Sequence, residues 1–262
     1  MNTNSEVAPV EPLDMPTTRL VGAYLAEARS EILRYLRLPS FLLPVMLFPA
    51  AFYLMFGVLM GARSGPEASR YLLASYATFG VMSPGLFGFG VSLAMERDGG
   101  LLTLKRALPM PPSAYLLGKA LMAMLAAGGV VVLLLSLAIG LAHVPLTAGQ
   151  CLHLMLTGML GVLPFCALGM LVGTLVKGQG APGLLNLVYL PMAFLSGLWF
   201  PLKMLPELLQ RIAPLWPSYH LNRIALDAVG ISQAPVWGNV LVLLGVSVLL
   251  FGLAARRLRR VG

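Results

Sequence analysis

Charge is what this sequence has least of. Only 11% of its 262 residues are charged, whereas 58% are hydrophobic, and an ordinary soluble domain carries about 25% charged residues. So few charges cannot cover a surface that faces water, which excludes a soluble globular protein and makes lipid the main solvent. The net charge of +8 then indicates membrane orientation rather than nucleic-acid binding, because basic residues gather on one side of a membrane.

Catalytic and metal-binding motifs are also lacking. The sequence has no phosphate-binding Gly-x-x-x-x-Gly-Lys-Ser/Thr loop, no His-Glu-x-x-His pair, no Gly-x-Ser-x-Gly turn and no Cys/His spacing typical of a metal site. The two cysteines, Cys151 and Cys166, are 15 residues apart, about 22 Å along a helix, which is too far for a disulfide. We therefore expect no enzymatic activity, no metal and no cofactor in this chain.

Charged side chains are missing from the long apolar runs as well. Six runs approach the roughly 20 residues of a spanning helix: Phe41 to Ala62, Tyr71 to Ala94, Ala120 to Ala142, Cys151 to Val176, Pro182 to Phe200 and Gly238 to Ala255. Because these runs are continuous rather than alternating, they predict an all-α fold with six transmembrane helices. His153 is the one ionisable side chain within them, which disfavours coupling to a proton or sodium gradient.

Lys and Arg are unequally distributed between the connections. With the N-terminus placed in the cytoplasm, 13 of the 18 basic residues fall on the cytoplasmic side and 5 on the outer side. This bias predicts that both termini are cytoplasmic and that the number of spans is even. The location that we expect for the chain is a bacterial inner membrane. Residues 1–17 have no signal-peptide pattern and predict a disordered cytoplasmic tail, and residues 18–262 predict a single transmembrane domain.

Two segments flank the predicted spans without crossing the membrane. Arg19 to Leu38 is an amphipathic helix on a helical wheel, with Glu31 within pairing distance of Arg34, and Pro39 ends it. It is typical of a helix in the cytoplasmic membrane interface, although packing on other protein would give the same pattern. Pro201 to Trp237 predicts two short re-entrant helices on the outer side, near residues 206–213 and 219–229.

The segment Met95 to Lys119 is the one long charged interruption between apolar runs. Gly99 and Gly100 break the second span, residues 101–108 predict a short helix, and the prolines that follow stop it. Leu101, Leu104, Lys105 and Leu108 share one stripe of that helix. A short helix tied rigidly to two spans is suited to a mechanical contact with a soluble partner. The alternative is a plain cytoplasmic loop.

Kinks are predicted where prolines interrupt the spans. Ser83-Pro84-Gly85 in the second span and Pro191 in the fifth predict bends, and Gly57-x-x-x-Gly61 and Gly169-x-x-x-Gly173 allow close helix contact. Kinked helices suit spans that line a cavity, but they also occur in static bundles. The residues that we expect to line a substrate path are Ser83, Phe87, Asn186, Tyr189 and Ser196.

Two stretches together give a family resemblance. The first is Glu96-Arg97, Gly99-Gly100, Leu101, Leu104, Lys105, Leu108-Pro109 and Tyr115-Leu116-Leu117-Gly118-Lys119; the second is Ser196-Gly197, Pro201, Leu205-Pro206 and Pro217-Ser218-Tyr219. With this layout the chain resembles the membrane subunit of type-2 ABC exporters. The resemblance implies a half-transporter that pairs with a second permease copy, as a homodimer or a heterodimer. ATP and Mg²⁺ would then be bound by a separate ATP-binding cassette subunit.

The resemblance also implies roles for the segments already described. The short helix at 101–108 would be the coupling helix, and the residues that would couple to the ATP-binding subunit are Glu96, Arg97, Leu101, Leu104, Lys105 and Leu108. We expect export of an amphipathic drug-like or antimicrobial compound, because the presumed path has few hydroxyl groups. A permease for a lipid-linked glycan, an ATP-independent secondary transporter and a non-transport scaffold are the alternatives. The expected partners include membrane lipid but no nucleic acid.

Overall fold

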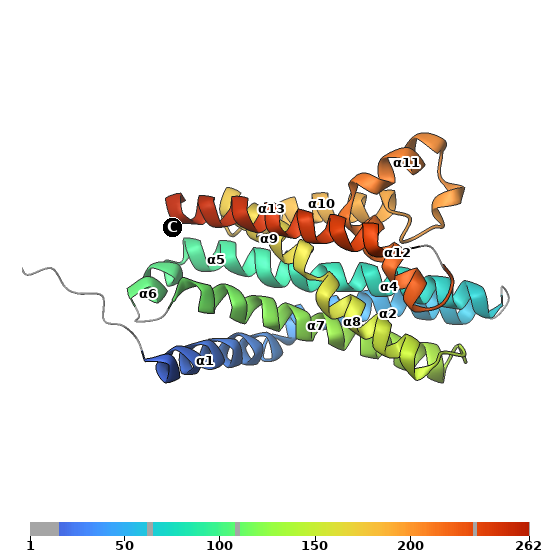
Figure 1. Ribbon diagram of the computed structural model, residues 1–262, viewed down its shortest axis with the longest axis horizontal. Helices are drawn as coiled ribbons and strands as arrows, with labels where there is room; N and C mark the ends of the chain where they lie inside the picture. The colour runs from blue at the N-terminus through green and yellow to red at the C-terminus, as the bar shows by residue number, and fades with distance from the viewer. Residues whose placement is uncertain (1–15, 62–64, 108–110, 233–234, 262) are drawn as a thin grey trace, which may run out of the picture.

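The structure is a computed structural model that describes residues 16–61, 65–107, 111–232 and 235–261. These residues form helices and no strands, with 85% of them in helix, which confirms the predicted all-α class. Most of the predicted tail, residues 1–15, lies outside the described residues, as does Leu108. The helices lie side by side along one long axis in Figure 1.

The helices follow one another with short connections. Their order is α1 (Thr17–Leu36), α2 (Pro39–Phe52), η1 (Tyr53–Met60), α4 (Pro66–Ser83), η2 (Pro84–Val91), α5 (Ser92–Asp98), α6 (Leu101–Ala107), α7 (Pro112–Gly140), α8 (Ala148–Gly161), α9 (Leu163–Leu175), α10 (Ala181–Leu195), η3 (Leu202–Met204), α11 (Glu207–Ile212), η4 (Ala213–Leu215), α12 (Pro217–Ala228) and α13 (Trp237–Val261). The helices predicted near residues 19–38 and within residues 201–237 are therefore confirmed.

Five of the helical stretches are long and apolar enough to cross a membrane. Within the described residues they are Leu42–Met60, Pro66–Asp98, Ser113–Gly140, Ala148–Leu175 and Trp237–Leu258. The predicted span at 182–200 is shorter than expected, because α10 ends at Leu195 after 15 residues. Gly197, with φ of 76°, follows in the left-handed conformation that ends many helices. Five of the six predicted spans are therefore confirmed, and the remaining one, at α10, is not.

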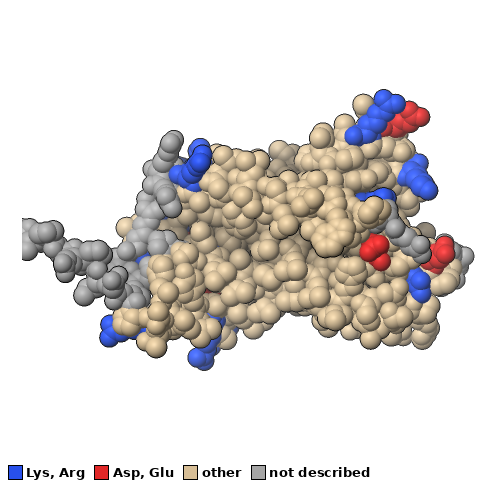
Figure 2. Space-filling model, in the orientation of Figure 1, with Lys and Arg blue, Asp and Glu red and all other residues tan. Residues whose placement is uncertain are grey.

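Charged residues gather at the two ends of the bundle. Figure 2 shows Lys and Arg at both ends of the visible face and Asp and Glu at the right-hand end, with an uncharged band between the two ends. Helices α1 and α6 and the C-terminal end of α13 share one end, here called the α6 end, while α11 and α12 lie toward the other (Figure 1). An uncharged band of this kind is the surface expected of a multi-pass membrane protein.

At the position of the bend predicted after Ser83, the helix changes from an α-helix to a π-helix. Pro84 has no N–H to donate, and the eight residues of η2 that begin with it form a π-helix. The widened helix lies directly against α9, where a Cβ on Gly169 would be 2.7 Å from the Gly85 carbonyl oxygen and one on Gly90 would be 2.7 Å from the Gly169 oxygen. The predicted close contact at Gly169-x-x-x-Gly173 is confirmed, because only glycine allows these backbones to meet.

We predict that Gly169→Ala destabilises the protein by about 1–3 kcal/mol, because the added methyl group forces two helix backbones apart. Gly245→Ala on α13 is the matched control, since its Cβ would meet nothing within 4 Å. Differential scanning fluorimetry of the detergent-purified proteins should show a lower melting temperature for the first variant only. Equal melting temperatures would contradict the backbone contact.

Candidate functional site

The predicted coupling segment forms a helical turn at the α6 end of the bundle. Helix α5 ends at Asp98, Gly100 has φ of 75°, and α6 then begins at Leu101. Leu104 is 67% exposed, whereas Leu102 is buried and Lys105 points inward to Glu27 and Glu31. The predicted stripe is therefore divided: Leu104 is presented outward, and Lys105 joins α6 to the bundle.

Glu96 lies inside the bundle rather than on its surface. Its carboxylate is only 8% exposed and accepts hydrogen bonds from Ser92 Oγ at 2.8 Å, Tyr115 Oη at 2.6 Å and Lys119 Nζ at 2.8 Å. Arg34 from α1 pairs with the same carboxylate. Its predicted role in coupling can therefore be exerted only through these neighbours, and not by direct contact with a partner.

Lys119 is the most deeply placed charge. Its side chain is 0% exposed, and its ammonium group lies 3.1 Å from Glu31 Oε2, 2.8 Å from Glu96 Oε1 and 2.5 Å from Ser92 Oγ. The Tyr115 ring lies 5.0 Å from the same nitrogen, a distance at which its π-face attracts a cation. A buried charge is tolerated only when it is paired and hydrogen-bonded, and these contacts supply both.

Three cations and three carboxylates form one connected network, which we call the ion cluster. Its members are Glu27, Glu31, Arg34, Glu96, Lys105 and Lys119. The predicted Glu31–Arg34 pair is confirmed at 3.2 Å. Because the members come from α1, α5, α6 and α7, the ion cluster links the short helix α6 to three other helices.

The formal charges of the ion cluster cancel, and the one member with a large exposed fraction is Arg34. Its side chain is 38% exposed. Partial burial by itself would lower the pKa of Arg34, but the carboxylates of Glu96 and Glu31 raise the pKa above its ordinary value. Arg34 therefore keeps its charge at any physiological pH.

Arg97, also predicted to couple, binds the end of a neighbouring helix. Its guanidinium donates to the carbonyl oxygens of Gly173 at 3.0 Å and Val176 at 2.8 Å, which are among the last carbonyls of α9 and lack partners within that helix. The next residue, Asp98, accepts a hydrogen bond from the Gly178 N–H at 2.6 Å. These contacts fix the end of α5 to the end of α9.

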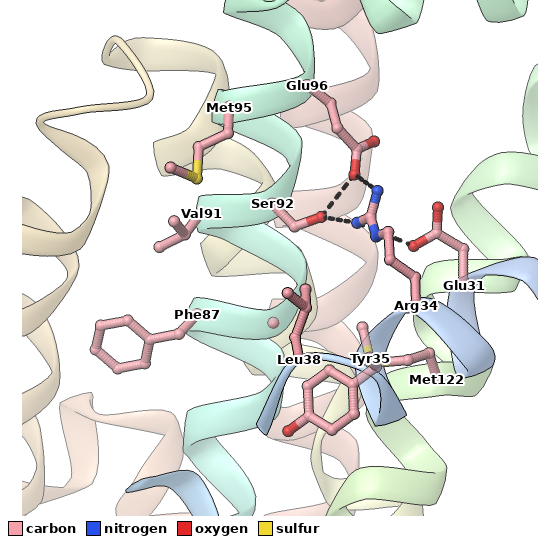
Figure 3. A pocket seen from close by; sticks show the side chains of 11 residues that line it. Glu31, Arg34, Tyr35, Leu38, Phe87, Val91, Ser92, Met95, Glu96 and Met122 are labelled. Atoms are coloured by element: carbon pink, nitrogen blue, oxygen red, sulfur yellow. Dashed lines mark hydrogen bonds and ion pairs between the residues drawn. The ribbon is translucent and has the colours of Figure 1, made fainter. Parts of the chain in front are cut away.

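A first cleft opens beside the ion cluster. It has a volume of about 310 Å³, with Glu31, Arg34, Ser92 and Glu96 at one end and an apolar wall at the other. Figure 3 shows the Arg34 guanidinium between Glu96 and Glu31, with Phe87 and Val91 farther along the helix and pointing to its other side. The residues of the apolar wall are Tyr35, Leu38, Phe87, Gly88, Val91, Met95 and Met122.

A second cleft lies farther along the bundle and brings most of the predicted path residues together. It has a volume of about 610 Å³ and is lined by Ser83, Phe87, Asn186 and Tyr189, with α2 residues and Leu190 completing it. Ser196 is not among them, because it is buried with its hydroxyl 2.5 Å from that of Ser218. Phe87 lines both clefts, so the two are adjacent.

Comparison with known proteins settles the family. The profile of the ABC-2 type transporter family matches residues 23–229. The chain belongs to this family. It is 30% identical over 237 residues to "Putative transport permease YvfS" of Bacillus subtilis (strain 168), covering 88% of this chain and 94% of that protein. It is also 29% identical over 180 residues to "Inner membrane transport permease YhhJ" of Escherichia coli (strain K12), covering 65% of this chain and 46% of the relative.

The comparisons confirm the family resemblance. The expected partner, a separate ATP-binding subunit, depends on that resemblance. Membrane subunits of this family are generally not enzymes, and they normally work with a separate ATP-binding subunit. Within the described ranges, no group of three His, Cys, Asp or Glu side chains is placed to hold a metal ion. The chain is therefore a multi-pass permease subunit of the ABC-2 family.

The members of the ion cluster lie in separate segments of the sequence, and the sequence analysis does not predict that they contact one another. It predicts Lys119 in the charged connection, whereas this residue is buried inside a helix long enough to span the membrane. A usable signal was present: Glu27 and Glu31, Ser92 and Glu96, and Tyr115 and Lys119 are each four residues apart, a spacing that puts both members of a pair on one face of a helix.

We predict that Lys119→Met destabilises the protein by about 3–5 kcal/mol, because it leaves buried carboxylates with too little positive charge. Adding Glu96→Gln should recover part of the loss, and thermal melting of both single variants and the double variant measures this coupling. Arg211→Met is the control, since its pair with Glu207 is 80% and 89% exposed and should leave the melting temperature unchanged. Additive losses in the double variant would contradict the network.

Proposed function

We propose that this chain is the transmembrane subunit of an ATP-driven exporter that moves an amphipathic, drug-like or antimicrobial compound out of the cytoplasm or inner leaflet. The observation that carries the proposal is the ion cluster. Through Lys105 it links the partly exposed helix α6 to α1, whose Arg34 lines the first cleft. Motion imposed on α6 from outside the bundle would thus reach a wall of the cleft.

The energy source in this proposal is a separate ATP-binding cassette subunit that contacts α6. The charged residues in the described spans lie near the helix ends, as Glu96 and Lys119 do, and the middles offer no side chain for ion coupling. Leu104, exposed at the surface of α6, is the contact that we propose for the groove of that subunit. Both termini would then be cytoplasmic, in a bacterial inner membrane.

The second cleft is the proposed substrate path. Its wall carries the α2 side chains Val45, Leu47 and Phe48, with Ser83 and Asn186 as polar groups. Such a mixture suits a compound with one or two polar groups on an apolar body. A second permease copy, identical or different, would close the open side of this cleft and complete a path between two subunits.

A permease for a lipid-linked glycan is the second candidate, and one observation favours it. Phe79 stacks on Tyr189 with ring centroids 4.8 Å apart, and Phe87 meets Tyr189 edge-on at 5.5 Å. Aromatic rings are suited to contact with sugars, but Phe79 and Tyr189 are buried and pack on each other and on further aromatic rings. This favours the amphipathic compound over the glycan.

The coupling proposal predicts a specific loss at Leu104. Leu104→Asp should weaken association with the ATP-binding subunit at least about tenfold, since a charge replaces an apolar contact that is worth about 1.4 kcal/mol or more. Leu208→Asp is the matched control, because Leu208 is 71% exposed on α11 toward the other end. Co-purification with ATP-binding cassette subunits of the source organism, followed by ATPase assays in vesicles, measures the effect. Equal co-purification of both variants would refute the assignment of α6.

The path proposal predicts a loss of transport when the second cleft is filled. Asn186→Trp should reduce efflux of amphipathic dyes about tenfold or more, because the indole ring occupies the cleft. Leu187→Trp is the control, since Leu187 is 69% exposed on the same helix and does not line the cleft. Dye efflux from cells expressing equal amounts of each variant gives the comparison. Full activity of the first variant would exclude this path.

A further inference from the structure

The first cleft has the two-part character of an amphiphile site. One end is formed by Arg34, Ser92 and two carboxylates, and the other by Leu38, Phe87 and further apolar side chains. In Figure 3 the polar side chains Ser92, Glu96 and Arg34 lie on one side of the helix that contains Phe87 and Glu96, and Phe87 points to the other side. A ligand that fills this cleft needs a polar head and an apolar body.

The polar end offers a cation rather than an anion. The side chains of Glu31 and Glu96 are 2% and 8% exposed, whereas that of Arg34 is 38% exposed. A guanidinium has five N–H groups, and among the described residues Arg34 directs three of them to Glu96, Ser92 and Glu31. Two N–H groups thus remain for a ligand, and a guanidinium favours phosphate or carboxylate oxygens.

The position of the cleft indicates where such a ligand would come from. Leu38 on its rim is 48% exposed, and it stands between α1, which exposes Leu25 and Leu36, and α2, which exposes Leu43 and Leu47. A helix with exposed leucines beside basic residues is typical of the headgroup region of a membrane. The apolar end of the cleft leads through Phe87 to the second cleft, which is the direction in which a lipid chain extends from its headgroup.

We propose that the first cleft binds the anionic head of an inner-leaflet amphiphile at Arg34, with its chain along Phe87, Val91 and Met122. The inference rests on the proposed function, because it makes the first cleft the route by which cargo reaches the second. It assigns the cargo, or a lipid that competes with it, a single negatively charged headgroup of the phosphate or carboxylate class.

The test compares fluorescent phosphatidylglycerol with fluorescent phosphatidylcholine, binding to the purified full-length chain in nanodiscs of neutral lipid. Met95 lies in the wall of this cleft and is 57% exposed, so a substitution there spares the core. We expect Met95→Glu to weaken phosphatidylglycerol binding about five- to tenfold by charge repulsion, while the neutral Met95→Gln binds as the parent does. Phosphatidylcholine binding should be equal in all three proteins.

A second pair of variants examines the guanidinium itself. Arg34→Gln should abolish the preference for phosphatidylglycerol, and Arg37→Gln, on an exposed position of the same segment, should retain it. If Arg34→Gln fails to fold, the Met95 pair decides. The inference is overturned if the parent binds both lipids equally, or if Met95→Glu binds phosphatidylglycerol as Met95→Gln does.

Inorganic phosphate distinguishes a lipid site from a plain anion site. Millimolar phosphate should displace the fluorescent phosphatidylglycerol only weakly, because it lacks the chain that contacts Phe87. Displacement at micromolar phosphate would overturn the amphiphile assignment. The binding assay contains no ATP and no partner subunit, so it does not depend on the proposed export. If the parent protein shows no preference for phosphatidylglycerol but cells expressing it still export dye, only the lipid-site inference is refuted. Lipid preference without any efflux would instead refute the proposed export.

Discussion

The positive charge of Lys119 is the constraint on which the α6 end of the molecule depends. A fully buried ammonium group is stable only among carboxylates and hydroxyl groups, and here Glu31, Glu96 and Ser92 supply them from α1 and α5. Those helices are therefore held at fixed positions around α7. An apolar packing contact could slide, whereas a hydrogen-bonded ion pair keeps its geometry within tenths of an ångström.

The ion cluster ties four helices together at the end of the permease where the proposed soluble partner would act, and three of its members line the first cleft. Phe87 lies in η2, a π-helix between the α-helices α4 and α5. The bundle thus combines an end held by ion pairs with a middle in which one helix changes its type. This division is suited to a protein that receives motion at one end and changes shape in its interior.

Hydropathy alone predicted the class, five of the spans and the helices that flank them, because each depends on a local run of residues. It overestimated the predicted span at 182–200, since the apolar character continues past Leu195 although Gly197 turns the chain. The ion cluster could not be predicted in full, because the distance between Glu31 and Lys119 is determined by the packing of α1 on α7. Four of the residues expected to line a path, Ser83, Phe87, Asn186 and Tyr189, line the second cleft. Ser196 does not, because its hydroxyl pairs with that of Ser218, a contact between distant segments that the sequence does not reveal.

The short length of α10 has a consequence for the surrounding lipid. Its 15 residues rise about 22 Å, against a hydrocarbon layer of about 30 Å. The chain turns back through Ser196 and Gly197, whose N–H groups donate to Met192 and Phe194, so their backbone is satisfied without a further helical turn. Beside Asn186 and Tyr189 the bilayer must therefore thin, or the short segments after α10 must fill the gap. Where the bilayer thins, the apolar barrier next to the second cleft is shorter than the usual hydrocarbon layer.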